Sequence, residues 1–191
     1  MSPGVKQSEP PYGAMIFSND LSTDVSTMSR TPLPASPVCC AVPAAVLDTQ
    51  VVLDWLVFRD AGCRALAADI ERGSLRWLAT RAMLDELGHV LDRGVASAWR
   101  PDRAVIRHAF ERHGTLIEAP AAVALPLRCT DPDDQMFIDL AQASGAAWLV
   151  TRDRALLALR RRAAARGIGV LRPADWALRP GRPGPVQLRT G

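Results

Sequence analysis

Lysine is almost missing from this sequence of 191 residues, and its scarcity excludes two kinds of active site. Lys6 is the only lysine, and it lies in an N-terminal stretch that we expect to be disordered. A phosphate-binding P-loop needs a lysine that reaches the phosphates, and a Schiff-base enzyme needs a lysine amine. The sequence also has no G-x-G-x-x-G or Walker pattern. It therefore gives no indication of a nucleotide cofactor.

Cysteines are few, and long apolar runs are missing. The four cysteines are Cys39, Cys40, Cys63 and Cys129, and they show neither C-x-x-C spacing nor paired histidine ligands. This pattern argues against a zinc site and against a disulfide framework, and it is typical of reduced thiols in the cytosol. The sequence has no stretch of 18 apolar residues and no signal-peptide layout. We therefore expect a cytoplasmic protein with no membrane partner.

The overall composition, 48% hydrophobic and 23% charged, is that of one globular domain with tails. Residues 1–42 are rich in Ser, Pro and Thr, so we predict a disordered N-terminal extension. An over-extended reading frame with a start at Met28 is the alternative. Residues 44–177 are expected to form the folded domain, and residues 178–191 a flexible C-terminal tail. The net charge of +3 suggests a polyanionic partner only weakly.

Short apolar segments alternate with helical patterns along the predicted domain. Strands are predicted at 44–48, 75–78, 115–118, 147–150 and 168–171. Helices are predicted at 51–58, 63–72, 81–92, 102–113, 131–144 and 153–165, with a short closing helix at 173–176. This alternation predicts an α/β fold in which a mostly parallel sheet is sandwiched by helices.

The stretch Ala44–Trp55, AAVLDTQVVLDW, is the segment around which the domain is expected to be organised. An apolar strand runs straight into Asp48, and Thr49 can begin the following helix. An Asp in this position lies at the carboxyl edge of a parallel sheet, where α/β folds place ligands. The alternative is that Asp48 only caps the helix, because Asp is a favoured cap residue.

Three further acids fall at comparable places. Glu86 lies at the border of the apolar stripe of its helix, where the alternative is a partly exposed edge residue. Asp134 is predicted in the first turn of a helix that has Pro132 at its first position, where an acid also complements the helix dipole. Asp153 follows the strand at 147–150, and it too would serve as a helix cap.

These acids predict a metal site, because the carboxyl ends of parallel strands meet at one edge of the sheet. Carboxylates held close together repel one another and raise each other's pKa, and a divalent cation removes that penalty. Oxygen ligands without His or Cys favour Mg²⁺ or Mn²⁺ over Zn²⁺. A site of this kind suits the hydrolysis of phosphodiester bonds.

Taken in order, the acidic motifs resemble those of PIN-domain ribonucleases. The matching segments are VLDTQ at 46–50, Thr80 followed by DEL at 85–87, DPDDQMFIDLA at 131–141 and WLVTRD at 148–153. The likeness extends from Ala44 to Trp176. It is strongest to the bacterial branch identified as toxins of toxin–antitoxin pairs.

The resemblance implies a Mg²⁺- or Mn²⁺-dependent endoribonuclease that hydrolyses RNA. The catalytic and metal-binding acids of the family fall on Asp48, Glu86, Asp134 and Asp153. Asp48 would be a principal metal ligand, and Asp153 would bind a second metal or position water. Thr151 would support the site by hydrogen bonds, and Asp131 would replace Asp134 if the helix register differs. The expected partners are the RNA substrate, a cognate antitoxin protein and a second copy in a homodimer formed through helices of the first half.

Gln50 departs from the family, which usually has Asn at this supporting position. The extra methylene shifts any hydrogen bond to the site, and residues that support metal ligands can change affinity by about 10–100-fold. An alternative therefore stays open: a catalytically weakened PIN-fold module that binds RNA or another protein. A phospho-acceptor receiver domain is not favoured, because it needs a lysine late in the domain.

Arginines gather near the last acid of the predicted site. Arg152 and Arg154 are predicted to contact RNA phosphates, together with the run Arg160–Arg162 and Arg166. The alternative is that these arginines form a solvated helix face.

Overall fold

The computed structural model of the chain describes residues 42–94, 96–119, 123 and 125–179. The predicted N-terminal extension, apart from Val42, and the predicted tail from residue 180 lie outside the described residues. No described helix is long and apolar enough to cross a membrane.

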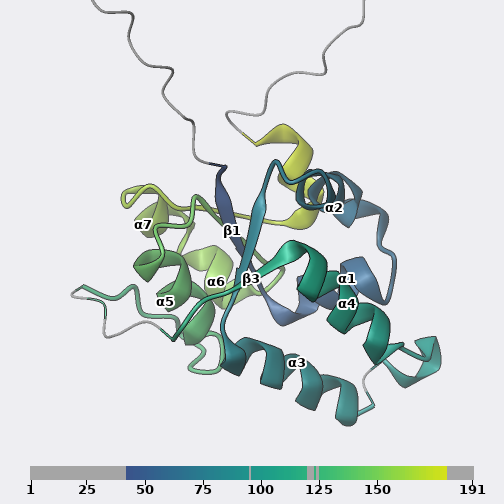
Figure 1. Cartoon of the computed structure of the whole chain (residues 1–191). Helices are drawn as coiled ribbons and strands as arrows, with labels where there is room; N and C mark the ends of the chain where they lie inside the picture. Colours follow the sequence, from purple (N-terminus) through teal and green to yellow (C-terminus); the bar gives the residue numbers. More distant parts are fainter. Residues whose placement is uncertain (1–41, 95, 120–122, 124, 180–191) are drawn as a thin grey trace, which may run out of the picture. The chain divides into compact units, whose positions relative to one another are not determined.

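Five strands form one sheet (Figure 1). They are β1 (Ala44–Leu47), β2 (Arg76–Ala79), β3 (Gly114–Leu116), β4 (Trp148–Val150) and β5 (Gly169–Leu171). Every pairing is parallel, and the strand order is β3-β2-β1-β4-β5. The predicted parallel α/β sheet is confirmed. The chain adds β2 and β3 on one side of β1 and then β4 and β5 on the other, so the strand order reverses between β1 and β4. Ligands are expected at the carboxyl ends of these two strands.

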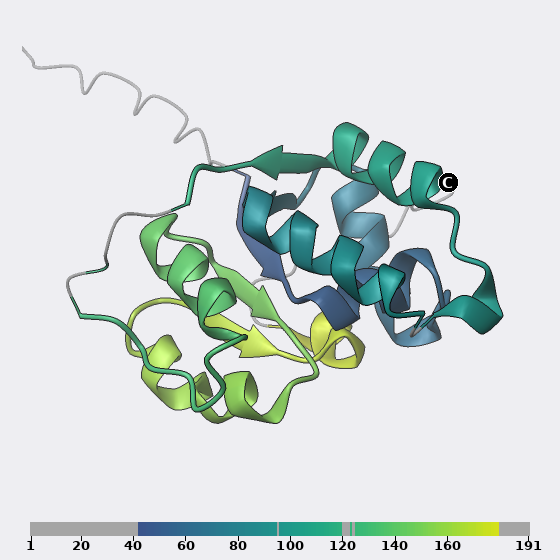
Figure 2. The same ribbon diagram turned by 90° about the horizontal axis from the view of Figure 1, so that it is seen from below.

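Helices cover both faces of the sheet. The α-helices are α1 (Thr49–Leu56), α2 (Arg64–Glu71), α3 (Arg81–Asp92), α4 (Arg103–His113), α5 (Gln135–Ala143), α6 (Arg154–Ala158) and α7 (Arg160–Ala164). Three short 3₁₀ helices are η1 (Ala61–Cys63), η2 (Ser97–Trp99) and η3 (Pro173–Leu178). Seen from below, α5, α6 and α7 lie on one side of the sheet and α1, α2 and α4 on the other (Figure 2).

Alternate strand residues supply two separate cores, which explains why the strands are apolar throughout. Val46 and Leu149 pack with α5, α6 and α7, whereas Leu47 and Val150 pack with α1, α2 and η3. Every residue of β1 is buried, as expected for a central strand with both faces covered. β1 is thus a rigid support for whatever follows it.

The helix that we predicted from Asp131 begins later. The side chain of Asp131 accepts a hydrogen bond from the backbone N–H of Asp133 at 3.0 Å, a local turn that competes with helix formation. α5 starts only at Gln135, so Pro132 is not its first residue and Asp134 lies at its N-cap position. The predicted position of Asp134 within the first helical turn was therefore wrong by one residue.

Other boundaries also differ from those predicted. The helix predicted from residue 102 begins at Arg103, and Asp102 caps it by accepting a hydrogen bond from the N–H of Ala104 at 2.8 Å. The single helix predicted over 153–165 is divided into α6 and α7. The division occurs because the N–H of Leu159 donates to the carbonyl of Leu156, a tighter turn than that of an α-helix.

Candidate metal centre

Asp48 follows β1 directly and caps α1. Its Oδ1 accepts a hydrogen bond from the N–H of Val51 at 2.7 Å. Its own N–H donates to the carbonyl of Val150 at 3.1 Å, which extends the pairing of β1 with β4. The residue is 4% exposed. The alternative of a helix cap is therefore correct as far as it goes, but the cap uses only one carboxylate oxygen.

The second oxygen of Asp48 is bound by the segment after β4. The hydroxyl of Thr151 donates to Oδ2, and the N–H of Arg152 donates to the same atom at 3.1 Å. The hydroxyl oxygen of Thr151 also accepts from the N–H of Asp153 at 2.9 Å. Burial raises the pKa of Asp48, and the hydrogen bonds from Thr151, Val51 and Arg152 oppose this rise. The carboxylate is thus fixed in orientation by three donors.

Asp134 and Asp153 lie together beside Asp48. Asp153 caps α6 by accepting hydrogen bonds from the N–H groups of Ala155 at 2.6 Å and Leu156 at 3.1 Å. Asp134 makes no such cap bond at the start of α5. Burial, followed by the charge of Asp153 and a hydrogen bond with it, raises the pKa of Asp134 to about 7. Asp48 adds to this rise, so the three carboxylates influence one another electrostatically.

All four predicted acids line one open groove of about 840 Å³. Its walls come from α1, α3, α5 and the segment after β4. Our sequence reasoning missed Asp85, Asp133 and His89, which also line the groove. His89 stands three residues after Glu86 and four after Asp85 on α3, so helical spacing was the signal that would have placed it beside them.

Glu86 enters the groove from α3 with a different partner. Its Oε1 lies 3.4 Å from Nη2 of Arg93, and its side chain is 37% exposed. Asp131 is exposed and does not line this groove. The structure therefore brings together Asp48, Asp134 and Asp153, places Glu86 on the wall, and favours Asp134 over Asp131.

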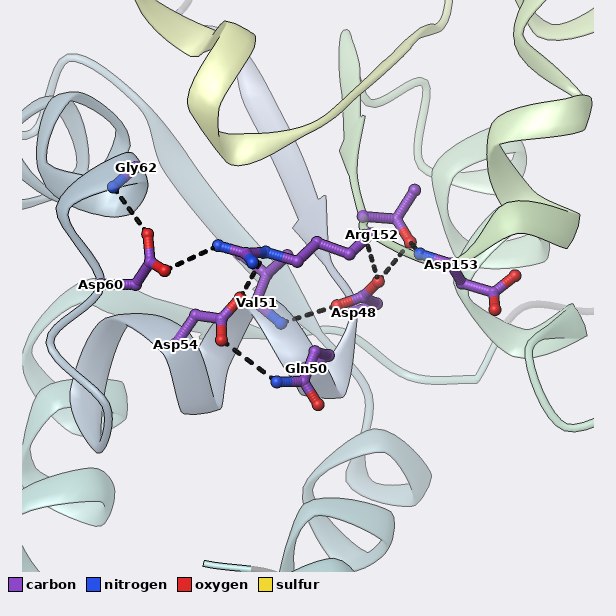
Figure 3. Close-up of polar contacts among 9 residues, drawn as sticks. Asp48, Gln50, Val51, Asp54, Asp60, Gly62, Arg152 and Asp153 are labelled. Carbon is purple, nitrogen blue, oxygen red and sulfur yellow. Dashed lines mark hydrogen bonds and ion pairs between the residues drawn. The ribbon is translucent and has the colours of Figure 1, made fainter. Parts of the chain in front are cut away.

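Gln50 and Arg152 point away from the Asp48 carboxylate (Figure 3). The side-chain amide of Gln50 donates to Oδ1 of Asp54 at 3.1 Å. The side chain of Arg152 runs from the end of β4 to α1, where Nε lies 2.6 Å from Oδ2 of Asp54 and Nη2 lies 3.0 Å from Oδ2 of Asp60. Arg154 is exposed, and within the described ranges it makes no ion pair.

Asp54 and Asp60 are partners that sequence reasoning did not identify. Asp54 stands in the otherwise apolar face of α1 and is 4% exposed. An acid inside an apolar helical stretch is a signal, because a buried carboxylate needs a partner. The partner itself, Arg152, is distant in the sequence and is not predictable from spacing.

The donor set fits a hard divalent cation, although the side chains are not yet gathered around one. Among the residues described, no three His, Cys, Asp or Glu side chains are arranged to hold a metal ion as they stand. Asp48, Asp134 and Asp153 nevertheless supply only carboxylate oxygens, which Mg²⁺ and Mn²⁺ prefer. Burial and then the charge of Asp153 raise the pKa of Asp134, and a bound cation would relieve the repulsion between the carboxylates.

Comparisons with known proteins identify the family of the chain. No curated protein matches the sequence. A crystal structure of VapBC2 from Rickettsia felis bound to a DNA fragment from their promoter is similar at 11% identity and a TM-score of 0.47, covering 68% of this chain and 98% of that one. A crystal structure of PAE2754 from Pyrobaculum aerophilum is similar at 19% identity and a TM-score of 0.45, covering 72% and 92%. The family model of the PIN domain matches residues 44–155, more than half of the chain. The chain therefore belongs to the PIN domain family.

Proposed function

We propose that this chain is a metal-dependent endoribonuclease that hydrolyses RNA phosphodiester bonds. PIN domains are generally nucleases and typically bind divalent metal ions. The observation that carries the proposal is the meeting of Asp48, Asp134 and Asp153 at the carboxyl edge of the parallel sheet, in a groove open to solvent. Asp48 and Asp153 cap helices, but Asp134 makes no cap bond, so helix capping does not account for all three carboxylates.

Asp48, Asp134 and Asp153 would hold Mg²⁺ or Mn²⁺, with Glu86 joining them if it separates from Arg93. A bound cation would activate water and stabilise the negative charge that develops on the phosphate. Asp48 contributes a carboxylate already oriented by Thr151 and two backbone N–H groups, so little freedom is lost on binding.

The other residues of the groove position the substrate or hold protons. Because the pKa of Asp134 is raised to about 7, its carboxyl group is partly protonated near neutral pH, and a cation would displace that proton. The exposed guanidinium of Arg154, adjacent to Asp153, is suited to contact an RNA phosphate. Unpaired RNA is the form whose bases are open to a protein, so single-stranded RNA is the substrate to test first.

We extend the proposal to the biological setting suggested by the resemblance in sequence motifs. The chain would be the toxin component of a toxin–antitoxin system in the cytoplasm. A cognate antitoxin protein would inhibit it, and a homodimer would form through helices of its first half. These features rest on the likeness to bacterial PIN toxins and not on a contact in the structure.

A second candidate is a PIN-fold module that binds RNA or protein without cleavage. Gln50 binds Asp54 and does not face Asp48, and Glu86 is paired with Arg93. Both features reduce the number of groups free to serve a metal. This reading predicts weak binding of Mn²⁺ and no hydrolysis.

Cleavage of labelled single-stranded RNAs tests the proposal. The purified protein is assayed in Mn²⁺, in Mg²⁺ and in EDTA, beside the Asp48→Asn variant, which keeps a residue able to cap α1. We expect metal-dependent cleavage that is lost in EDTA and reduced at least about 100-fold in the variant. Equal cleavage by the variant would indicate a contaminating nuclease or another site. No cleavage together with no Mn²⁺ binding would favour the second candidate.

A further inference from the structure

Residues of the segment 151–153 donate hydrogen bonds to the carboxylate of Asp48, yet only the first residue of the segment, Thr151, is hydrogen-bonded to the sheet. The N–H of Thr151 donates to the carbonyl of Leu171 at 3.0 Å, and the chain then leaves the sheet. Beyond that point, the N–H of Arg152 and the carboxylate of Asp153 must be held by other contacts. The side chain of Arg152 is the strongest candidate for that support.

Arg152 binds one helix at two points. Its backbone N–H binds Asp48 at the N-cap of α1, and its guanidinium lies against Asp54 further along the same helix. A third contact joins it to Asp60, whose Oδ1 accepts from the N–H of Gly62 at 2.6 Å. We call Arg152, Asp54 and Asp60 the arginine anchor. It fixes the segment after β4 against α1 (Figure 3).

The anchor joins an arginine whose side chain is 41% exposed to a buried carboxylate. Exposed pairs contribute little to stability, but the side chain of Asp54 is only 6% exposed. Among the described residues, Oδ2 of Asp54 has no hydrogen bond of good geometry, so the guanidinium 2.6 Å away compensates its charge. The guanidinium is thus paired with two carboxylates, and the RNA contact predicted for Arg152 stays a prediction.

We propose that Arg152 is a positioning residue of the candidate metal site. By holding the segment after β4 against α1, it keeps the Thr151 hydroxyl and its own N–H on Asp48 and holds Asp153 beside the groove. The role in metal binding rests on the proposed function. The role in holding the segment does not, and it is measurable without metal.

Two single variants separate positioning from stability. Arg152→Met removes the anchor. Arg179→Met is the matched control, because Nη2 of Arg179 lies 2.6 Å from Oδ2 of Asp69, whose side chain is 4% exposed, and neither residue lines the groove. Arg152→Met leaves the buried carboxylate of Asp54 without its cation, and Arg179→Met removes the more buried of the two cations of Asp69, which keeps its ion pair with Arg72. Amide hydrogen exchange at positions 152 and 153 is measured in EDTA, and Mn²⁺ affinity by calorimetry.

We expect Arg152→Met to accelerate exchange at positions 152 and 153 at least about tenfold more than its loss of global stability alone would produce. Arg179→Met should leave the exchange of these two amides unchanged after the same correction. The Mn²⁺ dissociation constant should rise about 10–100-fold in the first variant only. Unchanged exchange at positions 152 and 153 in Arg152→Met would overturn the positioning role.

A double variant, Asp54→Leu with Arg152→Met, keeps the test decisive if Arg152→Met fails to fold. It removes the unpaired buried charge and restores stability, because apolar pairs often replace buried ion pairs without loss. If Arg152 is a positioning residue, amide exchange at positions 152 and 153 stays fast in the double variant and its Mn²⁺ affinity stays low. Full recovery of both would show that the ion pair of Arg152 with Asp54 only stabilises the fold, and would refute the inference. If the wild type binds no Mn²⁺, the proposed function fails, while the exchange rates still decide the role of Arg152.

Discussion

Thr151 is the residue on which the geometry of the site depends most closely. It is fully buried, and its hydroxyl donates to Asp48 while accepting from the N–H of Asp153. No other described side chain touches two of the predicted acids through hydrogen bonds of this kind. One hydroxyl group therefore links the residue after β1, Asp48, to the residue before α6, Asp153.

Replacing Thr151 by Val tests this dependence. Valine keeps the shape of the side chain but leaves the Asp153 N–H without its acceptor, so the free energy of unfolding should fall by about 1–3 kcal/mol. Thr115→Val is the control, since among the described residues the Thr115 side chain has no hydrogen bond in β3. Urea unfolding of both variants is the measurement. Equal stability of the two would contradict the role assigned to the hydroxyl.

Asp134 gives the metal-free protein a characteristic pH dependence. Its pKa is raised to about 7 in the folded protein, from about 3.9 in an unfolded chain. Between these values the folded protein holds a proton that the unfolded chain has released. Stability in EDTA should therefore fall as the pH rises from about 4 to about 7.

The Asp134→Asn variant lacks this proton equilibrium, so its advantage in unfolding temperature over the wild type should grow with pH across that window. Thermal unfolding in EDTA at several pH values measures the difference. Curves that run parallel for the two proteins would show that the carboxylate does not titrate as its surroundings indicate.

Among the elements, β5 depends on a residue without a side chain. A Cβ built on Gly169 would lie 2.2 Å from the ring of Trp148 on the neighbouring strand β4. That ring packs edge-on against Trp176 of η3, with ring centroids 5.7 Å apart. A methyl group at this position must therefore displace an aromatic pair that joins β4 to η3.

We expect Gly169→Ala to lower the free energy of unfolding by about 1–3 kcal/mol through overpacking. Gly88→Ala is the matched control within α3, where a Cβ meets nothing within 4 Å. There alanine should raise stability by about 0.5–1 kcal/mol, because glycine is costly inside a helix. Chemical denaturation of the pair checks both signs, and a neutral Gly169→Ala would refute the packing argument.

For the molecule as a whole, Asp69 ties the end of the described chain to α2. Trp176 Nε1 donates to its Oδ2 at 2.8 Å, and Arg179 Nη2 lies 2.6 Å from the same atom. Burial acts to raise the pKa of Asp69, but the hydrogen bonds from Trp176 and Arg179 and the charges of Arg179 and Arg72 outweigh it. The pKa is therefore lowered.

Asp69→Asn should cost about 3–5 kcal/mol, because it leaves Arg179 nearly buried without its anion. The contribution of Asp69 is present above its unfolded pKa of about 3.9 and is lost as the pH falls through its lower folded pKa. The difference between wild type and variant, measured by unfolding at neutral and acidic pH, should shrink in acid. A constant difference would mean that the charge of Asp69 is not what stabilises the contact.

Local patterns in the sequence were enough to predict the architecture. The apolar run before Asp48 predicted a buried strand, and the pattern over 81–92 predicted a helix; both are found, as β1 and α3. The convergence of Asp48, Asp134 and Asp153 followed from the rule that parallel strands share a carboxyl edge. These predictions depend on periodicity and on adjacency in the chain, which a sequence displays directly.

Pairings between distant residues were beyond this reasoning. The contact of Arg152 with Asp54 depends on the exact placement of β4 beside β1, and the length of the arginine side chain reaches across that junction. The ion pair of Glu86 with Arg93 was hidden because both charges also suit an exposed helix face. The start of α5 was missed because the Asp131 side chain satisfies a backbone N–H and delays the helix.

The central claim is that Asp48, Asp134 and Asp153 form a binding site for a divalent metal ion. Anomalous X-ray scattering from crystals grown with Mn²⁺ tests it most directly, because it locates the ion itself. We predict a peak at a coordination distance of about 2.0–2.6 Å from the carboxylate oxygens of Asp48 and of Asp134 or Asp153, and a much weaker peak in the Asp134→Asn variant. A peak outside this groove, or equal peaks in the two proteins, would contradict the account.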